Sequence, residues 1–192
     1  MPRLLIITST TRPGRIGTAV ADWVLDLARE HGGFDVEVAD LAEIALPFLD
    51  EPDHPSEGAY IHDHTRRWSA MVDAADAFLI LAAEYNRGIT APLKNALDAL
   101  YAEWAGKPVG YVSYGMSSAG LRAVEMITPV AVALGMTPLP DVVTLPLREV
   151  LDPDGRLNPG ERRARGVHLL LEELLRYTEV LSQLSKRTNS SR

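Results

Sequence analysis

Residues 3–33 read RLLIITSTTRPGRIGTAVADWVLDLAREHGG, and this stretch decides the class of fold. The run Arg3–Thr8 is almost wholly apolar, as expected for a buried strand. Over Ile16–Glu30 apolar residues recur every three or four positions, which predicts an amphipathic helix. Gly32 and Gly33 then end that helix. A buried strand followed by a helix that can cover it is the repeating unit of α/β folds.

The alternation of strand and helix continues along the rest of the chain. Further strands are predicted at Phe34–Ala39, Ala77–Ala82, Pro108–Ser113 and Thr137–Leu145, and further helices at His62–Ala75, Ala91–Ala102, Ala119–Leu134 and Pro159–Lys186. The apolar run Ala77–Ala82 is typical of a central parallel strand, whereas Pro138 and Pro140 place the last strand at a sheet edge. The sequence therefore predicts a five-stranded, doubly wound parallel α/β sheet in a single domain over 1–192. Its core covers about 3–145, and a C-terminal helix covers about 159–186.

Composition limits the classes of function. A chain of 192 residues with 46% hydrophobic residues can bury a full core. The absence of cysteine excludes disulfides, thiolate metal sites and iron–sulfur clusters, so redox chemistry would need a bound organic cofactor. The net charge of −7 argues against nucleic-acid or anionic-membrane partners. No signal peptide is recognisable, and the longest apolar run, Phe78–Ala83, is too short to span a bilayer, so we expect a cytoplasmic protein.

Three loops follow predicted strands at the edge where parallel sheets bind ligands: Thr8–Gly17, Ala83–Ala91 and Ser113–Gly120. The first loop, TSTTRPGRIG, combines the free N–H groups of a helix start with hydroxyls and with two arginines, Arg12 and Arg15. That combination indicates a site for a phosphate group; the alternative is a turn whose arginines face water. Neither the Walker-type phosphate loop nor the G-x-G-x-x-G motif is present, which argues against P-loop ATPases and standard dinucleotide-binding folds.

The other two loops suit a flat ring. In AEYNRGITAPLKNALDAL, Tyr85 and Asn86 offer an aromatic surface and polar groups directly after the central strand. The loop SYGMSSAG is rich in small residues, which lets a ligand approach its backbone. Each loop could instead be an ordinary polar turn. A serine nucleophile is not expected, because the Gly115–Gly120 spacing does not fit the G-x-S-x-G elbow.

No metal site is predicted. His54, His62 and His64 lie near Asp53 and Asp63, in a pattern that imitates a metal cluster. His62 and His64 are two positions apart, however, and would not share a helix face. A solvated loop and helix start explains them.

Taken in order, STTRPGRIG, AEYNRGITAPLKNALD and SYGMSSAGLRAVE resemble the NADPH-dependent FMN reductase family, over about Arg3 to Leu145. The resemblance implies a flavodoxin-like fold with strand order 2-1-3-4-5, FMN as cofactor, and NADPH or NADH as electron donor. It implies hydride transfer from the nicotinamide to FMN and then to quinones, free flavin or similar small-molecule acceptors. The flavin would carry the chemistry, with no catalytic side chain. Members usually form dimers, so a homodimer or homotetramer is expected.

The resemblance also implies three groups of cofactor contacts. They are Thr10, Arg12, Arg15, Ile16 and Gly17 at the phosphate; Ala83, Glu84, Tyr85, Asn86 and Arg87 along the ring; and Ser113, Tyr114, Gly115 and Gly120 at its pyrimidine side. The sequence departs from the family pattern at Ser9, where glycine is common, and at Ala83, which replaces a proline. Whether Arg15 and Arg87 contact the flavin or a partner subunit stays open.

Two functions from other classes compete with an enzyme. One is a flavodoxin-type electron carrier, which would show a strongly acidic docking face. The other is an FMN-binding sensor or interaction module, for which the long segment Leu46–Tyr60 or the last helix would serve a partner. The moderate net charge and the basic first loop favour the reductase over the carrier.

Overall fold

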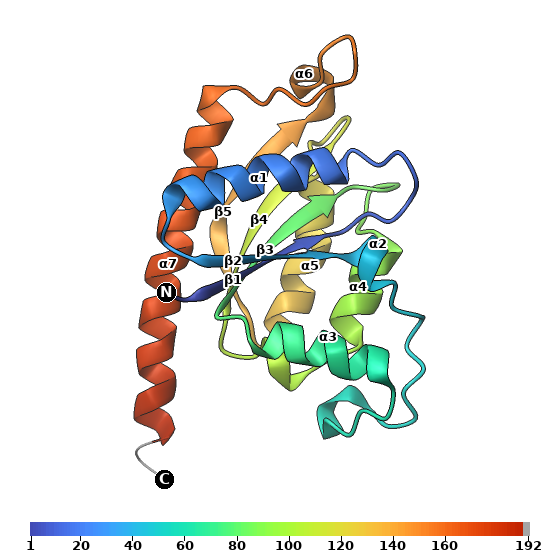
Figure 1. The fold of residues 1–192 in the computed structure, drawn as a ribbon, viewed down its shortest axis with the longest axis vertical. Helices are drawn as coiled ribbons and strands as arrows, with labels where there is room; N and C mark the ends of the chain where they lie inside the picture. The colour runs from blue at the N-terminus through green and yellow to red at the C-terminus, as the bar shows by residue number, and fades with distance from the viewer. Residues whose placement is uncertain (190–192) are drawn as a thin grey trace.

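In a computed structural model, which describes the backbone of residues 1–189 and the side chains of residues 1–184, five parallel strands form one sheet (Figure 1). The strands are β1 (Arg3–Thr8), β2 (Asp35–Asp40), β3 (Ala77–Ala83), β4 (Pro108–Gly115) and β5 (Thr137–Pro146). Their order is β2-β1-β3-β4-β5, which confirms the predicted doubly wound sheet. β5 pairs only with β4, so Pro138 and Pro140 lie in an edge strand, as their missing N–H groups require.

Helices cover both faces of this sheet. They are α1 (Gly17–His31), α2 (Leu41–Ile44), α3 (Asp63–Asp73), α4 (Ala91–Asp98), α5 (Leu121–Ala133), α6 (Leu147–Val150) and α7 (Glu161–Asn189), with short 3₁₀ turns at Pro55–Glu57 and Ala102–Trp104. α1 and α7 lie on one face and α3, α4 and α5 on the other (Figure 1). Within residues 1–189, no helix is both long and apolar enough to cross a membrane.

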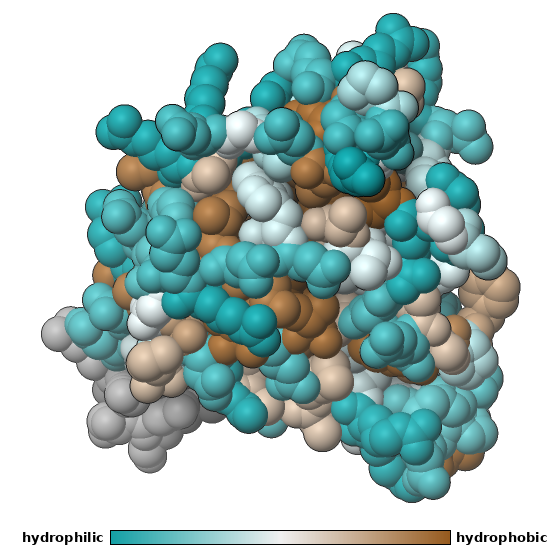
Figure 2. Space-filling view, turned by 45° about the horizontal axis from the view of Figure 1, so that its top comes forward, coloured by the Kyte–Doolittle hydropathy of each residue, from teal (hydrophilic) through white to brown (hydrophobic). Residues whose placement is uncertain are grey.

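The core lies in two layers, because alternate residues of each strand point to opposite faces of the sheet. Leu4, Ile6, Leu79 and Leu81 pack with Val20, Val24, Val167 and Leu170 on the α1 and α7 side. Leu5, Ile7, Phe78 and Ile80 pack with Trp68, Val72, Leu93 and Ile127 on the other side. The apolar stripe of the last helix therefore covers the sheet. The face in Figure 2 is mostly hydrophilic, and its hydrophobic residues gather in separate patches.

The predicted helix bounds differ from the observed ones by up to four residues, and the differences at α4 and α5 have a clear physical reason. α4 ends at Asp98 and not at Ala102, because the chain turns there to bury Trp104 against Phe78, with the Trp104 indole N–H donating to the Leu97 carbonyl. α5 begins at Leu121 and not at Ala119. Ala119 and Gly120 have φ of 53° and 89°, a left-handed backbone that cannot start a right-handed helix.

β4 is longer than predicted and takes up part of the third loop. It continues past Ser113 to Gly115, because Tyr114 pairs with Ala83 of β3 and Leu145 of β5. Ser113, Tyr114 and Gly115 are thus the end of a strand, and the loop itself begins at Met116.

Candidate functional site

The carboxyl ends of β1, β3 and β4 meet at a cavity of about 250 Å³. Its lining residues are Thr10, Arg12, Arg15, Ile16, Ala83, Glu84, Tyr85, Tyr114, Gly115, Met116 and Leu147. The structure thus brings together residues from all three predicted loops. Thr10 and Tyr114, for example, are more than a hundred positions apart in the sequence. Met116 and Leu147 were not predicted as lining residues. Met116 lies within the quoted SYGMSSAG motif, whereas nothing in the sequence marked the end of β5 as part of the site.

Five predicted residues, Gly17, Asn86, Arg87, Ser113 and Gly120, do not line the cavity. Gly17 begins α1 directly beside Thr10. A Cβ added at Gly17 would lie 2.3 Å from Thr10 Oγ1 and 2.8 Å from the Tyr114 hydroxyl. Only glycine therefore allows the first turn of α1 to sit this close to the loop.

The first loop is anchored to the middle of the sheet. The Ser9 hydroxyl donates to the Leu81 carbonyl at 2.6 Å and accepts from the Ala83 N–H at 2.9 Å. The Thr90 hydroxyl, which caps α4, donates to the Ser9 carbonyl. Ser9 is therefore the point at which the first loop is tied to the second.

Thr10 is tied to β4. Its hydroxyl oxygen lies 3.3 Å from the hydroxyl of the buried Tyr114. Burial raises the pKa of Tyr114, so this phenol is neutral and can share its proton with Thr10. The contact fixes where the Thr10 hydroxyl points in the cavity wall.

Arg15 is paired inside the protein. Its Nη2 lies 2.6 Å from Oδ2 of Asp40, and both side chains are largely buried. Burial opposes ionisation of Asp40, but the Ala42 N–H, Arg15 and the Thr8 hydroxyl outweigh it and lower the pKa of this carboxyl. The Nε–H of Arg15 is buried without a hydrogen-bond partner. An unsatisfied buried donor lowers the stability of the folded protein by about 1–3 kcal/mol. A ligand that supplied an acceptor to this N–H would remove that cost.

Arg12 differs from Arg15 in being exposed. Its one side-chain hydrogen bond within the described part of the chain goes to the neighbouring Pro13 carbonyl, at 3.3 Å. Among the described side chains it forms no ion pair. The first loop thus presents one fixed cation and one free cation.

The second loop starts with a tight two-residue turn. Tyr85 and Gly88 exchange backbone hydrogen bonds at 3.0 Å, and the two residues between them, Asn86 and Arg87, have φ of 49° and 70°. Two left-handed residues in succession form a type I′ turn. This geometry puts Asn86 and Arg87 at an exposed tip and leaves Tyr85, 42% exposed, at the cavity rim.

Glu84 lines the cavity, but its carboxylate connects the second loop to the third. One oxygen lies 3.0 Å from Nη1 of Arg122, and the other accepts the Arg122 N–H at 3.3 Å and the Ser118 hydroxyl. Burial opposes ionisation of Glu84, yet the hydrogen bonds from Ser118 and Arg122 lower its pKa. The carboxylate is therefore charged and already paired.

Ser113 and Gly120 hold the third loop against the end of β4. The Ser113 hydroxyl donates to the Ala119 carbonyl at 2.8 Å. A Cβ at Gly120 would lie 2.5 Å from the Tyr114 nitrogen, and one at Gly115 would lie 3.0 Å from the Gly120 nitrogen. The loop can fold back on the end of β4 only with glycine at both positions.

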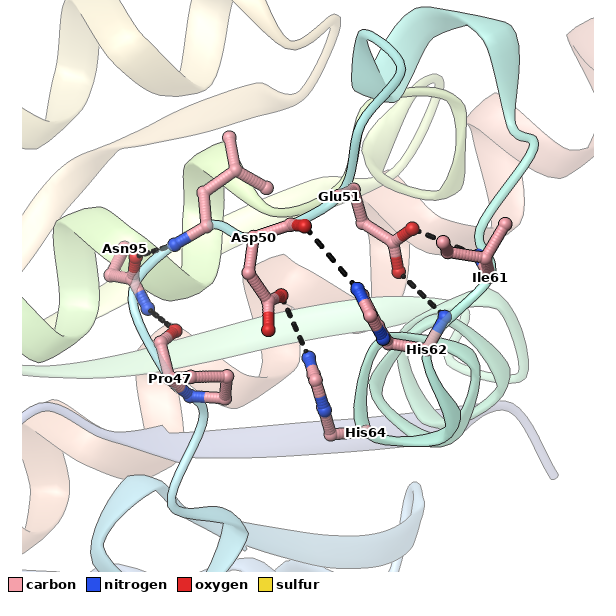
Figure 3. Close-up of polar contacts among 8 residues, drawn as sticks. Pro47, Asp50, Glu51, Ile61, His62, His64 and Asn95 are labelled. Carbon is pink, nitrogen blue, oxygen red and sulfur yellow. Dashed lines mark hydrogen bonds and ion pairs between the residues drawn. The ribbon is translucent and has the colours of Figure 1, made fainter.

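Two of the three histidines considered above as metal ligands, His62 and His64, bind Asp50 in the segment Leu46–Tyr60 (Figure 3). The His62 and His64 rings stack with centroids 5.1 Å apart. His62 Nε2 lies 3.3 Å from the Asp50 carbonyl oxygen, and His64 Nε2 lies 2.9 Å from the Asp50 carboxylate. Across the described residues, no three His, Asp or Glu side chains are grouped as metal ligands.

Comparison with known proteins places the chain among flavoenzymes. Residues 2–148 match the model of a family described as NADPH-dependent FMN reductase. The chain is 33% identical over 187 residues to an NAD(P)H-dependent FMN reductase of Schizosaccharomyces pombe, a match that covers 96% of this chain and 86% of that protein. It is 28% identical over 134 residues to an NAD(P)H:quinone oxidoreductase of Solanum tuberosum, covering 68% and 67% of the two chains. The solved structure of FerB, a flavoenzyme NAD(P)H:(acceptor) oxidoreductase from Paracoccus denitrificans, shares the fold with a TM-score of 0.72 at 18% identity, over 93% of this chain and 98% of that one.

Proposed function

The chain belongs to the NADPH-dependent FMN reductase family, and from that premise we propose that it uses bound FMN to oxidise NADPH or NADH and to reduce a small-molecule acceptor. The observation that carries the proposal is the cavity itself. It lies where the three family motifs converge, at the carboxyl ends of β1, β3 and β4. Doubly wound sheets bind their ligands at this edge.

The residues of the first loop fit the phosphate of FMN. A phosphate monoester carries close to two negative charges and three acceptor oxygens. Thr10, Arg12 and Arg15 line the same part of the cavity, beside the N-terminus of α1. The unpartnered Arg15 Nε–H gives the phosphate a donor that the protein itself leaves unsatisfied. Gly17 lets the free N–H groups of the first helical turn come close to the same point.

The remaining lining residues fit the ring. Ala83, Tyr85, Gly115 and Met116 provide small or apolar surface. A cavity of about 250 Å³ lies just below the usual range of about 300–1,000 Å³ for ligand pockets, so it would enclose only part of FMN. The rest of the flavin would stay open to the electron donor and acceptor.

The ionisable side chains of the cavity take positioning roles. Glu84 holds the third loop through Ser118 and Arg122, and Tyr114 fixes Thr10. Bound FMN supplies the chemistry, which is acceptance of a hydride from the nicotinamide and its delivery to the acceptor. The protein binds the flavin, orients it and sets its electrostatic surroundings.

Quinones, free flavin and similar molecules are the proposed acceptors, a choice supported by the plant quinone oxidoreductase among the relatives. We further propose that the chain acts as one domain, as a homodimer or homotetramer in the cytoplasm. The single-domain proposal is supported by α7, whose Val167, Leu170 and Leu174 pack into the same cluster as β1 and β3.

One assay tests the proposed function. The purified protein is loaded with FMN, and oxidation of NADPH and NADH is followed anaerobically with menadione as acceptor. Rapid turnover is expected. Bound flavin that neither nicotinamide can reduce would overturn the proposal, and long-lived one-electron-reduced flavin on photoreduction would favour the electron carrier.

A further inference from the structure

A second cavity, of about 460 Å³, lies on the other side of the first loop. Thr11 lines this second cavity, whereas its neighbours Thr10 and Arg12 line the first. The remaining lining residues are Leu41, Ala42, Ala45, Leu46, Pro47, Phe48, Ala91, Pro92 and Asn95. Its volume falls within the range of small-molecule sites. The cavity also borders the second loop, because Ala91 and Pro92 begin the helix into which that loop runs.

The wall of this cavity is held in place although it belongs to an irregular segment. The Asn95 side chain donates to the Pro47 carbonyl at 2.7 Å and accepts the Leu49 N–H at 3.1 Å (Figure 3). Glu51 accepts the N–H groups of Ile61 and His62 at 2.8 and 3.1 Å. The segment that carries Pro47 and Phe48 is thus bonded to α4 and to the residues just before α3. The cavity exists before any ligand arrives.

The lining chemistry suits a flat, uncharged ring. No charged side chain lines the second cavity, and its surface is mainly aliphatic. Phe48 is 81% exposed, so one ring is offered almost completely to a ligand. Bases stack on aromatic side chains in this way, and each such contact contributes about 1–3 kcal/mol. The Thr11 hydroxyl adds one polar group at the edge.

Cations flank the cavity on the side of the first one. Arg12 is exposed on the first loop, and Arg87 is exposed at the tip of the turn that precedes Ala91. Arg87 forms no ion pair with any described side chain. A ligand that extended from one cavity to the other would pass between these two loops. Phosphate groups in the middle of such a ligand would be favoured by Arg87, since Arg12 is already assigned to the FMN phosphate.

NADPH and NADH have this distribution of chemistry. Their nicotinamide reacts, their phosphates lie in the middle, and their adenosine half must bind elsewhere on the protein. Two further cavities in the described part of the chain lie elsewhere, one between β5 and α7 and one beside Arg3 at the amino end of β1. The second cavity shares the first loop with the flavin site.

We propose that the cavity lined by Thr11, Leu46, Phe48 and Ala91 binds the adenosine half of the nicotinamide donor. The proposal rests on the proposed function. Binding energy from this non-reacting half would hold the nicotinamide over the flavin and so raise kcat/KM for the dinucleotide.

The test compares NADPH with reduced nicotinamide mononucleotide, a donor that lacks the adenosine half. Phe48→Ala removes the stacking surface, and Ala91→Phe fills the cavity. Ile61→Ala is the control, because Ile61 is an exposed apolar residue of the same region that lines no described cavity. Both cavity variants should lower kcat/KM for NADPH about fivefold or more, as expected from the lower end of the stacking energy cited, and leave the mononucleotide within about twofold. In calorimetry with FMN-loaded protein, ADP-ribose should bind the wild type and Ile61→Ala, and bind both cavity variants several-fold more weakly.

Three outcomes would overturn the proposal: equal losses with both donors, unchanged kinetics with NADPH, or unchanged ADP-ribose binding. Equal losses together with a change of oligomeric state in light scattering would assign the cavity to a subunit contact. Failure of the proposed function is distinguishable, because the wild type would then oxidise neither donor.

Discussion

Arg15 donates to the Asp40 carboxylate from Nη2 at 2.6 Å, while its buried Nε–H has no acceptor among the described residues. The guanidinium is thus held by one carboxylate in an orientation that leaves a second donor for a ligand. Asp40 is the last residue of β2 and pairs in register with Thr8 of β1. The pairing of β1 with β2 therefore places the Asp40 carboxylate beside the start of the first loop.

Arg15→Lys should separate the two roles of this arginine. Lysine keeps the positive charge beside Asp40 but removes the planar Nε–H donor. Hydrogen bonds to charged groups contribute about 1.5–3 kcal/mol, so FMN should bind about tenfold or more weakly while riboflavin affinity changes little. Flavin fluorescence titration measures both. Arg67→Lys, an exposed arginine on α3, is the matched control; equal weakening of FMN and riboflavin would show that Arg15 is not a phosphate contact.

Asp40→Asn should make folding stability depend less on pH below pH 7. The folded protein lowers the pKa of Asp40, so the ionised carboxylate contributes stability above its unfolded pKa of about 3.9, and this contribution is lost as pH falls through the lower folded value. We expect the variant to melt a few degrees lower than wild type at pH 7 and to lose less stability on acidification. Thermal unfolding at steps from pH 7 to pH 3 measures this. Parallel curves for the two proteins would contradict the assignment.

Gly17→Ala should damage the flavin site because the new methyl group has no room beside Thr10 Oγ1. Overpacking of this kind costs about 1–3 kcal/mol, and FMN affinity should fall with it. Gly166→Ala in α7 is the comparison, since a Cβ added there would make only ordinary contacts, 3.5 and 3.9 Å from the Val143 side chain. Adding Thr10→Ala to Gly17→Ala should recover only part of the stability, because the Tyr114 hydroxyl stays 2.8 Å from the added Cβ, and it should not recover phosphate affinity, because the Thr10 hydroxyl is then missing. Urea unfolding and FMN titration measure the two effects, and no recovery in the double variant would place the clash elsewhere.

Glu84→Gln should loosen the third loop. The neutral amide keeps the shape of the side chain but weakens its bonds to Arg122 and Ser118. Faster amide hydrogen exchange is expected over Met116–Gly120, together with weaker FMN binding, while β3 keeps its protection. A double-mutant cycle with Arg122→Gln should give a coupling energy of about 0.5–3 kcal/mol. Additive effects would mean that the two side chains do not act together.

Much of this architecture could be predicted from local pattern. The bounds of β1 and the cap of α4 at Thr90 follow from a continuous apolar run and from a threonine before Ala-Pro. The five-stranded order follows from the alternation of strands and helices together with the family motifs. The strand bounds and the helix cap depend on residues close together in sequence, which is why local pattern is sufficient for them, whereas the strand order was implied by the family resemblance.

The partners of the polar side chains could not be predicted in the same way. Glu84 was expected along the ring, but its carboxylate pairs with Arg122, 38 positions away. Tyr114 was expected in a loop, but its pairing with both neighbouring strands makes it part of β4. The Arg15–Asp40 pair could have been predicted from the sequence. The parallel strands β1 and β2 end side by side, and the acidic residue Asp40 ends β2. Leu147 had none, because its place depends on where β5 ends relative to the sheet.

The cross-links between the loops limit how this site could be re-engineered or could diverge. Ser9 is bonded to β3 and to Thr90, Thr10 to Tyr114, and Glu84 to Ser118 and Arg122. A chimera that takes one of these loops from a relative would leave hydrogen-bond partners behind in the other two. Grafts that transfer all three loops as a set should fold and bind flavin, whereas single-loop grafts should not.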